Sequence, residues 1–253
     1  MKLRLRQAEA ASGPRPTGLG VHATARIEAT ATGRATTLPV LHGDGPFELR
    51  RLRSRGGEAR VCIIGAMSAP LGGDRLCIAA AADDDATLHI TTAAATLALR
   101  GSTPDHATYD VRLTAGEGAR LHWLPKPLIS ARGSNLRQSC TVDLAPTARL
   151  VLREEQILGR AEEPPGHLIT RLTIRRDGHP LLDHQTAYGP RAPGWDGPAI
   201  LSDHRAIGQL LIVDPDFEKT PPKTRLLGHD TADGQGVLVP LAGPRRADHR
   251  TGP

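Results

Sequence analysis

The sequence is poor in aromatic residues, which make up 2% of its 253 residues. Proteins that bind single-stranded nucleic acid stack bases on aromatic side chains, and this chain has few with which to build such a platform. Apolar residues still reach 39% of the chain, so a core must consist of Leu, Val, Ile and Ala. Full burial of one Val, Leu or Ile side chain contributes about 1.5–3 kcal/mol, so a stable fold requires many of them together.

Cysteine and long apolar runs are also scarce. Cys62, Cys77 and Cys140 form no CxxC pair, and the apolar neighbours of Cys62 and Cys77 predict that these two are small core residues. The first ten residues, MKLRLRQAEA, lack the apolar centre of a secretion signal. No stretch approaches the 18 or so apolar residues that cross a membrane. We therefore expect a soluble, cytoplasmic protein with no membrane partner.

Lysine is rare, and arginine supplies most of the cations behind the formal charge of +5. Nucleic-acid-binding proteins cluster their cations on one face or tail, whereas these arginines are interleaved with Asp and Glu. The densest run, residues 50–55, is interpreted as a solvated loop. Nucleic-acid binding is kept only as an alternative function, motivated by a pI of about 9.5.

Motifs of catalysis and metal binding are missing as well. The sequence contains no G-x-S-x-G, no P-loop and no G-x-G-x-x-G after a strand, and its eleven histidines form no H-x-H or H-E-x-x-H pair. We therefore expect no enzymatic activity. A β-fold enzyme with an unrecognised site is a second alternative, because sequence alone does not show titratable groups gathered in a pocket.

A weak internal repeat is the main structural pattern. Four segments share an alanine followed by alternating polar and apolar residues, and their alanines are 27, 33 and 29 residues apart. The segments are 59–63, 86–90, 119–123 and 148–152. Alternation with a period of two places one set of side chains on one face of a strand. Recurrence at about 30 residues favours stacked β-coils over an ordinary antiparallel sheet with similar hairpins.

Turn-forming residues divide the rest of the chain. Residues 111–114 and 120–123 flank a Gly-containing loop and predict a hairpin; residues 172–176, followed by Asp177-Gly178, predict another. Pro180 then belongs at a strand start or a sheet edge. We expect a poorly ordered segment at 1–20, one β-rich domain at 21–218 and a Gly/Pro/Arg-rich tail at 219–253.

Two acidic segments allow both a structural and a functional interpretation. Gly72-Gly73-Asp74 is typical of a tight turn in which Asp74 accepts backbone N–H groups, but its glycines also permit close approach to a ligand. Glu154 and Glu155 follow an alternating segment, so one of them should point inward. That carboxylate then either lines a polar interior or pairs with Arg153 or Arg160, because an unpaired buried charge is costly.

Four motifs, taken in order, resemble those of the UreD family, also called UreH. They are Gly72-Gly73-Asp74, the TTAAAT segment at 91–96, the LHWLPKP segment at 121–127, and Glu154 with Leu158-Gly159-Arg160. Glu163 falls where the family has its next acidic residue, although Glu162 stands where the family usually has Gly. The resemblance covers about residues 57–213, and four motifs in sequence are far more specific than any one.

The resemblance implies an all-β, β-helix-like stack of strands with a few short helices. It also implies a non-catalytic accessory protein that helps to deliver nickel to apo-urease in a complex with UreF and the GTPase UreG. In that family nickel is thought to pass through an internal channel as transient cargo. Asp74, Glu154 and Glu163 are the candidate transient ligands, because carboxylate oxygens hold such an ion more weakly than thiolates and so release it.

Overall fold

The computed structural model describes residues 20–202, 204–218 and 235–241, which form two β-sheets. Sheet A has the order β14-β13-β11-β8-β5-β1-β2, and sheet B has the order β16-β15-β12-β9-β6-β4-β3. The strands of sheet A are, in this order, His179–Tyr188, His167–Arg176, Asn135–Leu144, Ala107–Ala115, Arg75–Ala82, His22–Thr32 and Ala35–His42. Those of sheet B are Gln235–Leu241, Ala206–Val213, Arg149–Leu158, Arg120–Leu124, Thr87–Thr92, Ala59–Gly65 and Phe47–Arg51. The short strands β7 (Thr96–Ala98) and β10 (Leu128–Ser130) extend sheet B beside β12.

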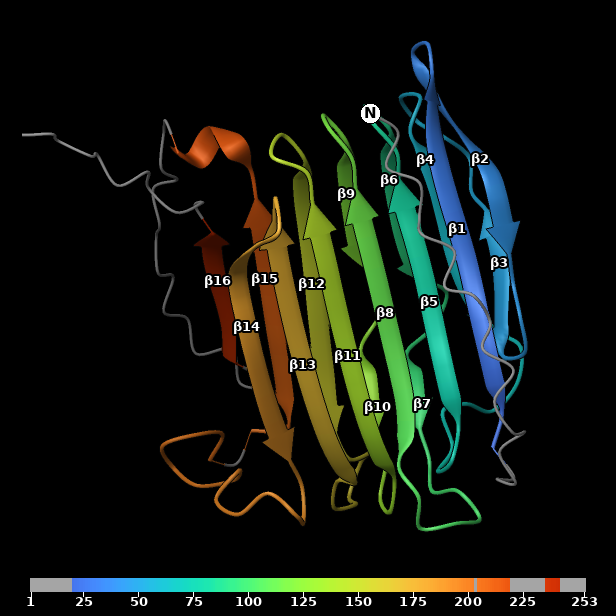
Figure 1. Cartoon of the computed structure of the whole chain (residues 1–253). Coiled ribbons are helices and arrows are strands. Elements are labelled where there is room, and N and C mark those ends of the chain that lie inside the picture. Colours follow the sequence, from blue (N-terminus) through green and yellow to red (C-terminus); the bar gives the residue numbers. More distant parts are fainter. Residues whose placement is uncertain (1–19, 203, 219–234, 242–253) are drawn as a thin grey trace, which may run out of the picture.

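The chain passes from one sheet to the other in successive coils. The strands β5, β8, β11 and β13 pair in parallel in sheet A, and β4, β6, β9 and β12 do so in sheet B. Figure 1 shows these coils stacked side by side across the molecule. The predicted all-β stack is confirmed. Within the described residues, its helical part is one 3-10 turn, η1 (Pro215–Glu218).

The sequence repeat corresponds to this stack. Leu88, Leu121 and Leu150 pair across β6, β9 and β12, and each is completely buried. The alanines that precede these leucines by two residues are equally buried. The first repeat is offset by two residues, because Ala59 rather than Val61 pairs with Leu88. The repeat therefore marks sheet B, with three of its four copies in structural register.

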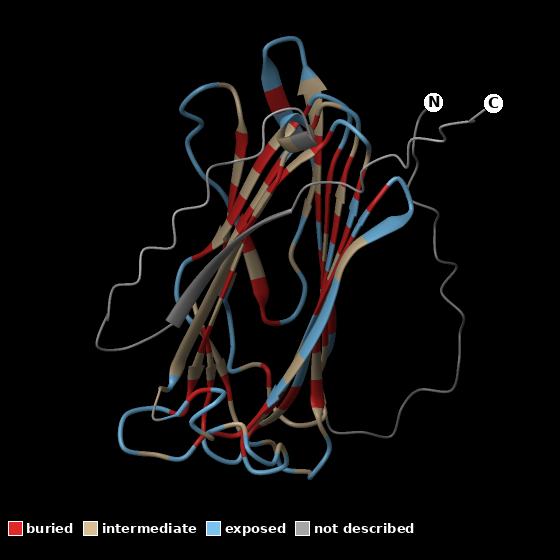
Figure 2. Cartoon of the chain, turned by 90° about the vertical axis from the view of Figure 1, so that its left-hand side faces the viewer, coloured by how far each residue is buried: buried red, intermediate tan, exposed pale blue. Residues whose placement is uncertain are grey.

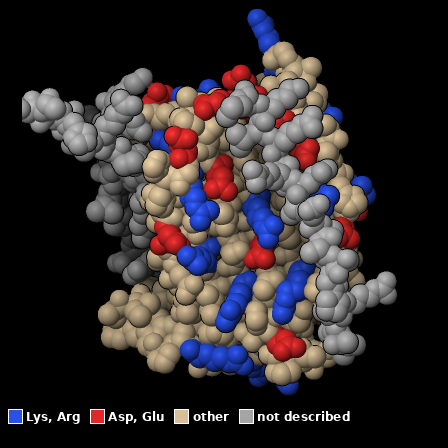
Figure 3. Space-filling view, in the orientation of Figure 1, with Lys and Arg blue, Asp and Glu red and all other residues tan. Residues whose placement is uncertain are grey.

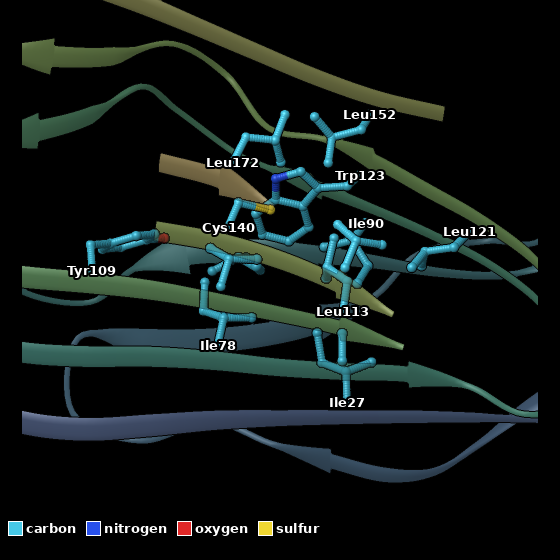
Figure 4. Packing of buried hydrophobic residues seen from close by; sticks show 14 of the residues in the cluster. Ile27, Ile78, Ile90, Tyr109, Leu113, Leu121, Trp123, Cys140, Leu152 and Leu172 are labelled. Atoms are coloured by element: carbon cyan, nitrogen blue, oxygen red, sulfur yellow. The ribbon is translucent and has the colours of Figure 1, made fainter. Parts of the chain in front are cut away.

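The core lies between the two sheets and is almost entirely aliphatic. Figure 2 shows the two layers with buried residues recurring along their strands, and Figure 4 shows side chains from both sheets meeting between them. Cys140 is buried there, at 1% exposure. The prediction that Cys62 and Cys77 are core residues was wrong: both are half-buried. Their neighbours Val61 and Leu76 take the inward positions, and alternation turns the two cysteines outward.

One predicted hairpin exists and the other does not. The strands β13 and β14 form the expected hairpin, with Asp177 and Gly178 at φ of 51° and 74° in its turn. Residues 111–114 and 120–123, by contrast, lie in β8 and β9, which belong to opposite sheets. A Gly-containing turn between two alternating segments is therefore compatible either with a hairpin or with a corner at which the chain crosses to the other sheet.

The two outer strands of sheet A share a feature. β2 and β14 both run antiparallel to their neighbours, and each contains a proline at an irregularity in pairing. In β2 the register shifts around Pro39, and in β14 it shifts beside Pro180. Proline has no N–H to offer to a sheet, so the expected edge position of Pro180 is confirmed.

The expected terminal segments, 1–20 and 219–253, lie largely outside the described residues. Residues 1–19, 203, 219–234 and 242–253 lie outside the described residues. Within the segment expected to be a tail, residues 235–241 form β16, which pairs in parallel with β15. Among the described residues, no helix is long and apolar enough to span a membrane.

The buried leucine row yields a prediction for stability. Leu121→Ala removes a completely buried side chain from the middle of that row, so we expect the free energy of unfolding to fall by about 2–5 kcal/mol. Leu52→Ala is the matched control, because Leu52 is 37% exposed and should change the free energy by less than about 1 kcal/mol. Urea titration followed by circular dichroism measures both. Equal losses would contradict the assigned register.

Candidate functional site

Polar side chains interrupt the apolar interior at the end of one strand. Along β12, Leu150 and Leu152 face inward, and Glu154 and Gln156 continue the same row with 5% exposure each. The intervening Glu155 is half-buried, and its Oε2 lies 3.4 Å from Nε of Arg153. Of the two adjacent glutamates, Glu154 is therefore the inward one, and the partner of Arg153 is Glu155.

Glu154 is held by a neutral partner. Gln209 of β15 lies opposite it in the antiparallel pairing, and its Nε2 donates a hydrogen bond of 2.6 Å to Oε2 of Glu154. No ion pair to Glu154 occurs in the described part of the chain. Burial raises the pKa of Glu154 to about 7, and the hydrogen bond from Gln209 offsets part of that rise. The carboxyl group therefore changes its charge near neutral pH.

Sheet A contributes a thiol and a phenol to the same interior. Burial raises the pKa of Cys140 on β11 well above its ordinary value, and the charge of Glu154 raises it further. Burial also raises the pKa of Tyr109 on β8, against a hydrogen bond with Thr96. Figure 4 shows Cys140, Tyr109 and Trp123 pointing into the space between the sheets. The thiol and the phenol are thus protonated at neutral pH, which leaves Glu154 as the group that supplies a charge here.

Asp74 lies in a tight turn at the start of β5. Its Oδ1 accepts a hydrogen bond of 2.8 Å from the N–H of Val21, and its Oδ2 accepts one of 2.8 Å from the N–H of Leu71. Gly73 has a φ of +96°, which few other residues adopt without strain. Asp74 is 2% exposed. The tight-turn interpretation is therefore confirmed, and the carboxylate ties this turn to the backbone just before β1.

Glu163 closes the loop between β12 and β13. Its Oε1 accepts hydrogen bonds from the N–H of Arg160 and of Arg132 at 3.1 Å each, and both its oxygens bind the Arg160 guanidinium. These contacts, led by the one with Arg160, lower the pKa of Glu163 to about 2. Glu162 has a φ of +60°, a left-handed conformation that glycine adopts more readily. Backbone geometry thus favours glycine at the position where this chain departs from the UreD pattern.

The three acids do not form one cluster. Asp74 and Glu163 precede β5 and β13 at the same end of sheet A, but β8 and β11 lie between these strands. Three strand spacings amount to roughly 14 Å. Glu154 lies within β12 of the opposite sheet. In the described residues, no three His, Cys, Asp or Glu side chains are arranged to hold a metal ion.

Three of the polar groups around Glu154 were not predicted from the sequence. Gln156 follows Glu154 by two residues, so the alternation that turned Glu154 inward also identifies it. Gln209 is separated from Glu154 by 55 residues, and only the pairing of β12 with β15 reveals the contact. Cys140 shows no local pattern that marks it as a neighbour of this carboxylate.

Known proteins resemble the chain over most of its length. The profile of the UreD urease accessory protein family matches residues 21–243. The chain is 66% identical over 231 residues to urease accessory protein UreD 2 of Saccharopolyspora erythraea, covering 91% of this chain and 82% of that protein. It is 58% identical to urease accessory protein UreD 3 of Streptomyces griseus, covering 89% and 88%.

More distant relatives carry the same description. Urease accessory protein UreD of a Parafrankia strain is 34% identical over 264 residues, covering 92% of this chain and 86% of that protein. The matched range includes all sixteen strands of the description and each of the four motifs. The chain belongs to the UreD family of urease accessory proteins.

Proposed function

We propose that the chain is a non-catalytic accessory protein that helps to insert nickel into apo-urease, acting in the cytoplasm in a complex with UreF and UreG. Membership of the UreD family and the names of the relatives support the role in urease maturation. The partners and the nickel cargo follow from the resemblance of the motifs. In this proposal nickel is a transiently bound ion that is transferred to urease, and not a resident cofactor of this chain.

Glu154 is the observation that carries the proposal. An ionised carboxylate in an apolar interior costs several kcal/mol unless a cation accompanies it, yet among the described residues the hydrogen-bond partner of Glu154 is the neutral amide of Gln209. Groups with such perturbed pKa values cluster at functional sites. A divalent cation that enters this space would supply the missing positive charge, with the amide oxygens of Gln156 and Gln209 as further weak donors.

Asp74 and Glu163 take a secondary place in this path. The oxygens of both carboxylates already accept backbone N–H groups, so a nickel ion would have to compete with those hydrogen bonds. Both lie at the same end of sheet A, where an ion would enter or leave the path under this proposal. The alternatives, a β-fold enzyme or a nucleic-acid-binding protein, have no comparable support.

The first prediction of this proposal concerns assembly. Co-expression with UreF and UreG should yield a complex that contains this chain and migrates as one species in size-exclusion chromatography. Elution of the chain alone, under conditions in which both partners are folded, would remove the main support for a scaffold role.

The second prediction separates nickel transfer from folding. Glu154→Gln preserves shape but removes the charge, so urease activation should fall about tenfold at unchanged yield of the complex. Glu155→Gln is the matched control: it removes the same charge from the outer face and should leave activation intact. Urease activity and complex yield are measured on the same preparations.

The same assay decides the role of the other two acids. Under the proposal, Asp74→Ala and Glu163→Ala lower activation more than they lower complex yield. If activity falls only in proportion to yield, these two acids are structural and do not belong to the nickel path.

The third prediction follows from the raised pKa of Glu154. Its pKa is about 7 in the folded chain against 4.5 for an ordinary glutamate, so the folded state loses stability as pH rises through that window. The glutamine in Glu154→Gln does not titrate, so this variant should not lose stability as the pH rises. We expect its free energy of unfolding to match that of the parent near pH 4.5 and to exceed it by about 3 kcal/mol at pH 8. Urea titrations at a series of pH values measure the difference, and Glu155→Gln should show no such slope.

A further inference from the structure

A hollow lies on the outside of the stack, away from the Glu154 interior. It is bordered by the turn between β1 and β2, by the loop between β3 and β4, and by the outer face of β6 with the first residue of β9. Its volume is about 490 Å³. Four arginines from these segments and from the start of β4 line it: Arg34, Arg55, Arg60 and Arg120. Three separate parts of the chain therefore contribute arginines to the lining of one hollow.

Thr36 fixes the walls of this hollow. Its N–H donates a hydrogen bond of 2.7 Å to the carbonyl of Gly57, and its Oγ1 accepts one of 3.0 Å from the N–H of Thr87. Gly57 has a φ of +95°, and a side chain there would lie 2.5 Å from the carbonyl oxygen of Arg34. Thr36 is 6% exposed, so water does not compete for these bonds. The hairpin, the loop and the sheet are thus held together, and the hollow is preformed.

The acidic groups of the hollow do not balance its arginines. Glu58 accepts hydrogen bonds from the N–H groups of Arg55 at 2.9 Å and Gly56 at 2.7 Å. These bonds lower the pKa of Glu58 to about 2, and its carboxylate is thus bound to the backbone of its own loop. Arg60 lies at the outer limit of an ion pair with it, at 4.0 Å. Asp85 is the second acid of the lining. Four arginines and two acidic residues thus line the hollow.

Three of the arginines are exposed and lack an ion-pair partner among the described residues: Arg34, Arg55 and Arg120. His89 forms part of the floor and stacks on His122, with ring centroids 4.0 Å apart and an angle of 18° between the planes. Burial lowers the pKa of both histidines, that of His122 to about 4. The positive charge therefore comes from permanent guanidinium groups, and the neutral imidazole of His89 adds a hydrogen-bonding group.

We propose that this hollow binds a compact, multiply charged oxyanion of the phosphate type, such as a diphosphate group. Guanidinium groups bind phosphate oxygens through paired N–H donors, and here four arginines from three parts of the chain line one hollow. A long nucleic acid requires instead a continuous basic stripe. On the described part of the sheet A face, Figure 3 shows acidic side chains among the Lys and Arg side chains and no continuous basic stripe. The site is independent of the proposed nickel path.

Titration calorimetry of the full-length chain with inorganic pyrophosphate, at about 50 mM salt, tests this site, since low salt preserves interactions between exposed charges. We expect saturable binding of one equivalent. The double variant Arg34→Gln, Arg120→Gln should bind about tenfold or more weakly, because each lost guanidinium removes charge-assisted hydrogen bonds. Both residues are exposed, and circular dichroism verifies that the variant is folded.

The matched control removes the same charge elsewhere. Arg26 and Arg112 are exposed on the outer face of sheet A, so Arg26→Gln, Arg112→Gln should leave the affinity within about twofold, the scale of a general change in net charge. Equal weakening by both double variants, or the absence of saturable binding, would overturn the site. Tighter binding of citrate than of pyrophosphate would overturn its assignment to phosphate.

Discussion

Parallel pairing of successive coils is the constraint on which the rest of this structure depends. Because β6, β9 and β12 of sheet B pair in register, Leu88, Leu121 and Leu150 all face the interior. A slip by one residue would turn every such side chain outward. The same rule decides the position of Glu154, four residues beyond Leu150 on the same face. Its burial is therefore imposed by the register of the whole stack and not by any local preference of a glutamate.

Side-chain contacts between neighbouring coils recur at the corners where the strands begin and at those where they end. Where the strands of sheet A begin, Asp74 accepts a backbone N–H from the residue before β1, and Glu163 accepts the backbone N–H of Arg132 in the preceding coil. Where the strands end, Asp84 accepts a hydrogen bond from the N–H of Glu117. The carboxylate of Glu117 in turn accepts one from the hydroxyl of Thr147 in the next coil. Parallel coils leave N–H groups at their corners without partners from the sheet ladder, and short acidic side chains satisfy them. Acidic residues that look functional in the sequence thus also serve to join coils.

The sequence predicted those features that depend on local alternation. The repeated strands, the turn at Asp177-Gly178 and the inward direction of one of two adjacent glutamates all follow from a period of two. It failed where the answer depends on residues far away along the chain. The segments at 111–114 and 120–123 resemble a hairpin, and only pairing with other coils places them in opposite sheets. Likewise, no local pattern reveals that Gln209 meets Glu154, or that Arg55 in an apparently solvated loop lines the same hollow as Arg34 and Arg120.

The prolines of β2 and β14 have a consequence for assembly. A stack of parallel strands is open at both ends, and each end of such a sheet is a template on which another chain can continue the ladder. In sheet A both ends finish with a reversed strand whose pairing is disturbed beside a proline, so the exposed row of N–H groups is incomplete. Among the described strands, the two edges of sheet A therefore offer another chain a less regular template for pairing.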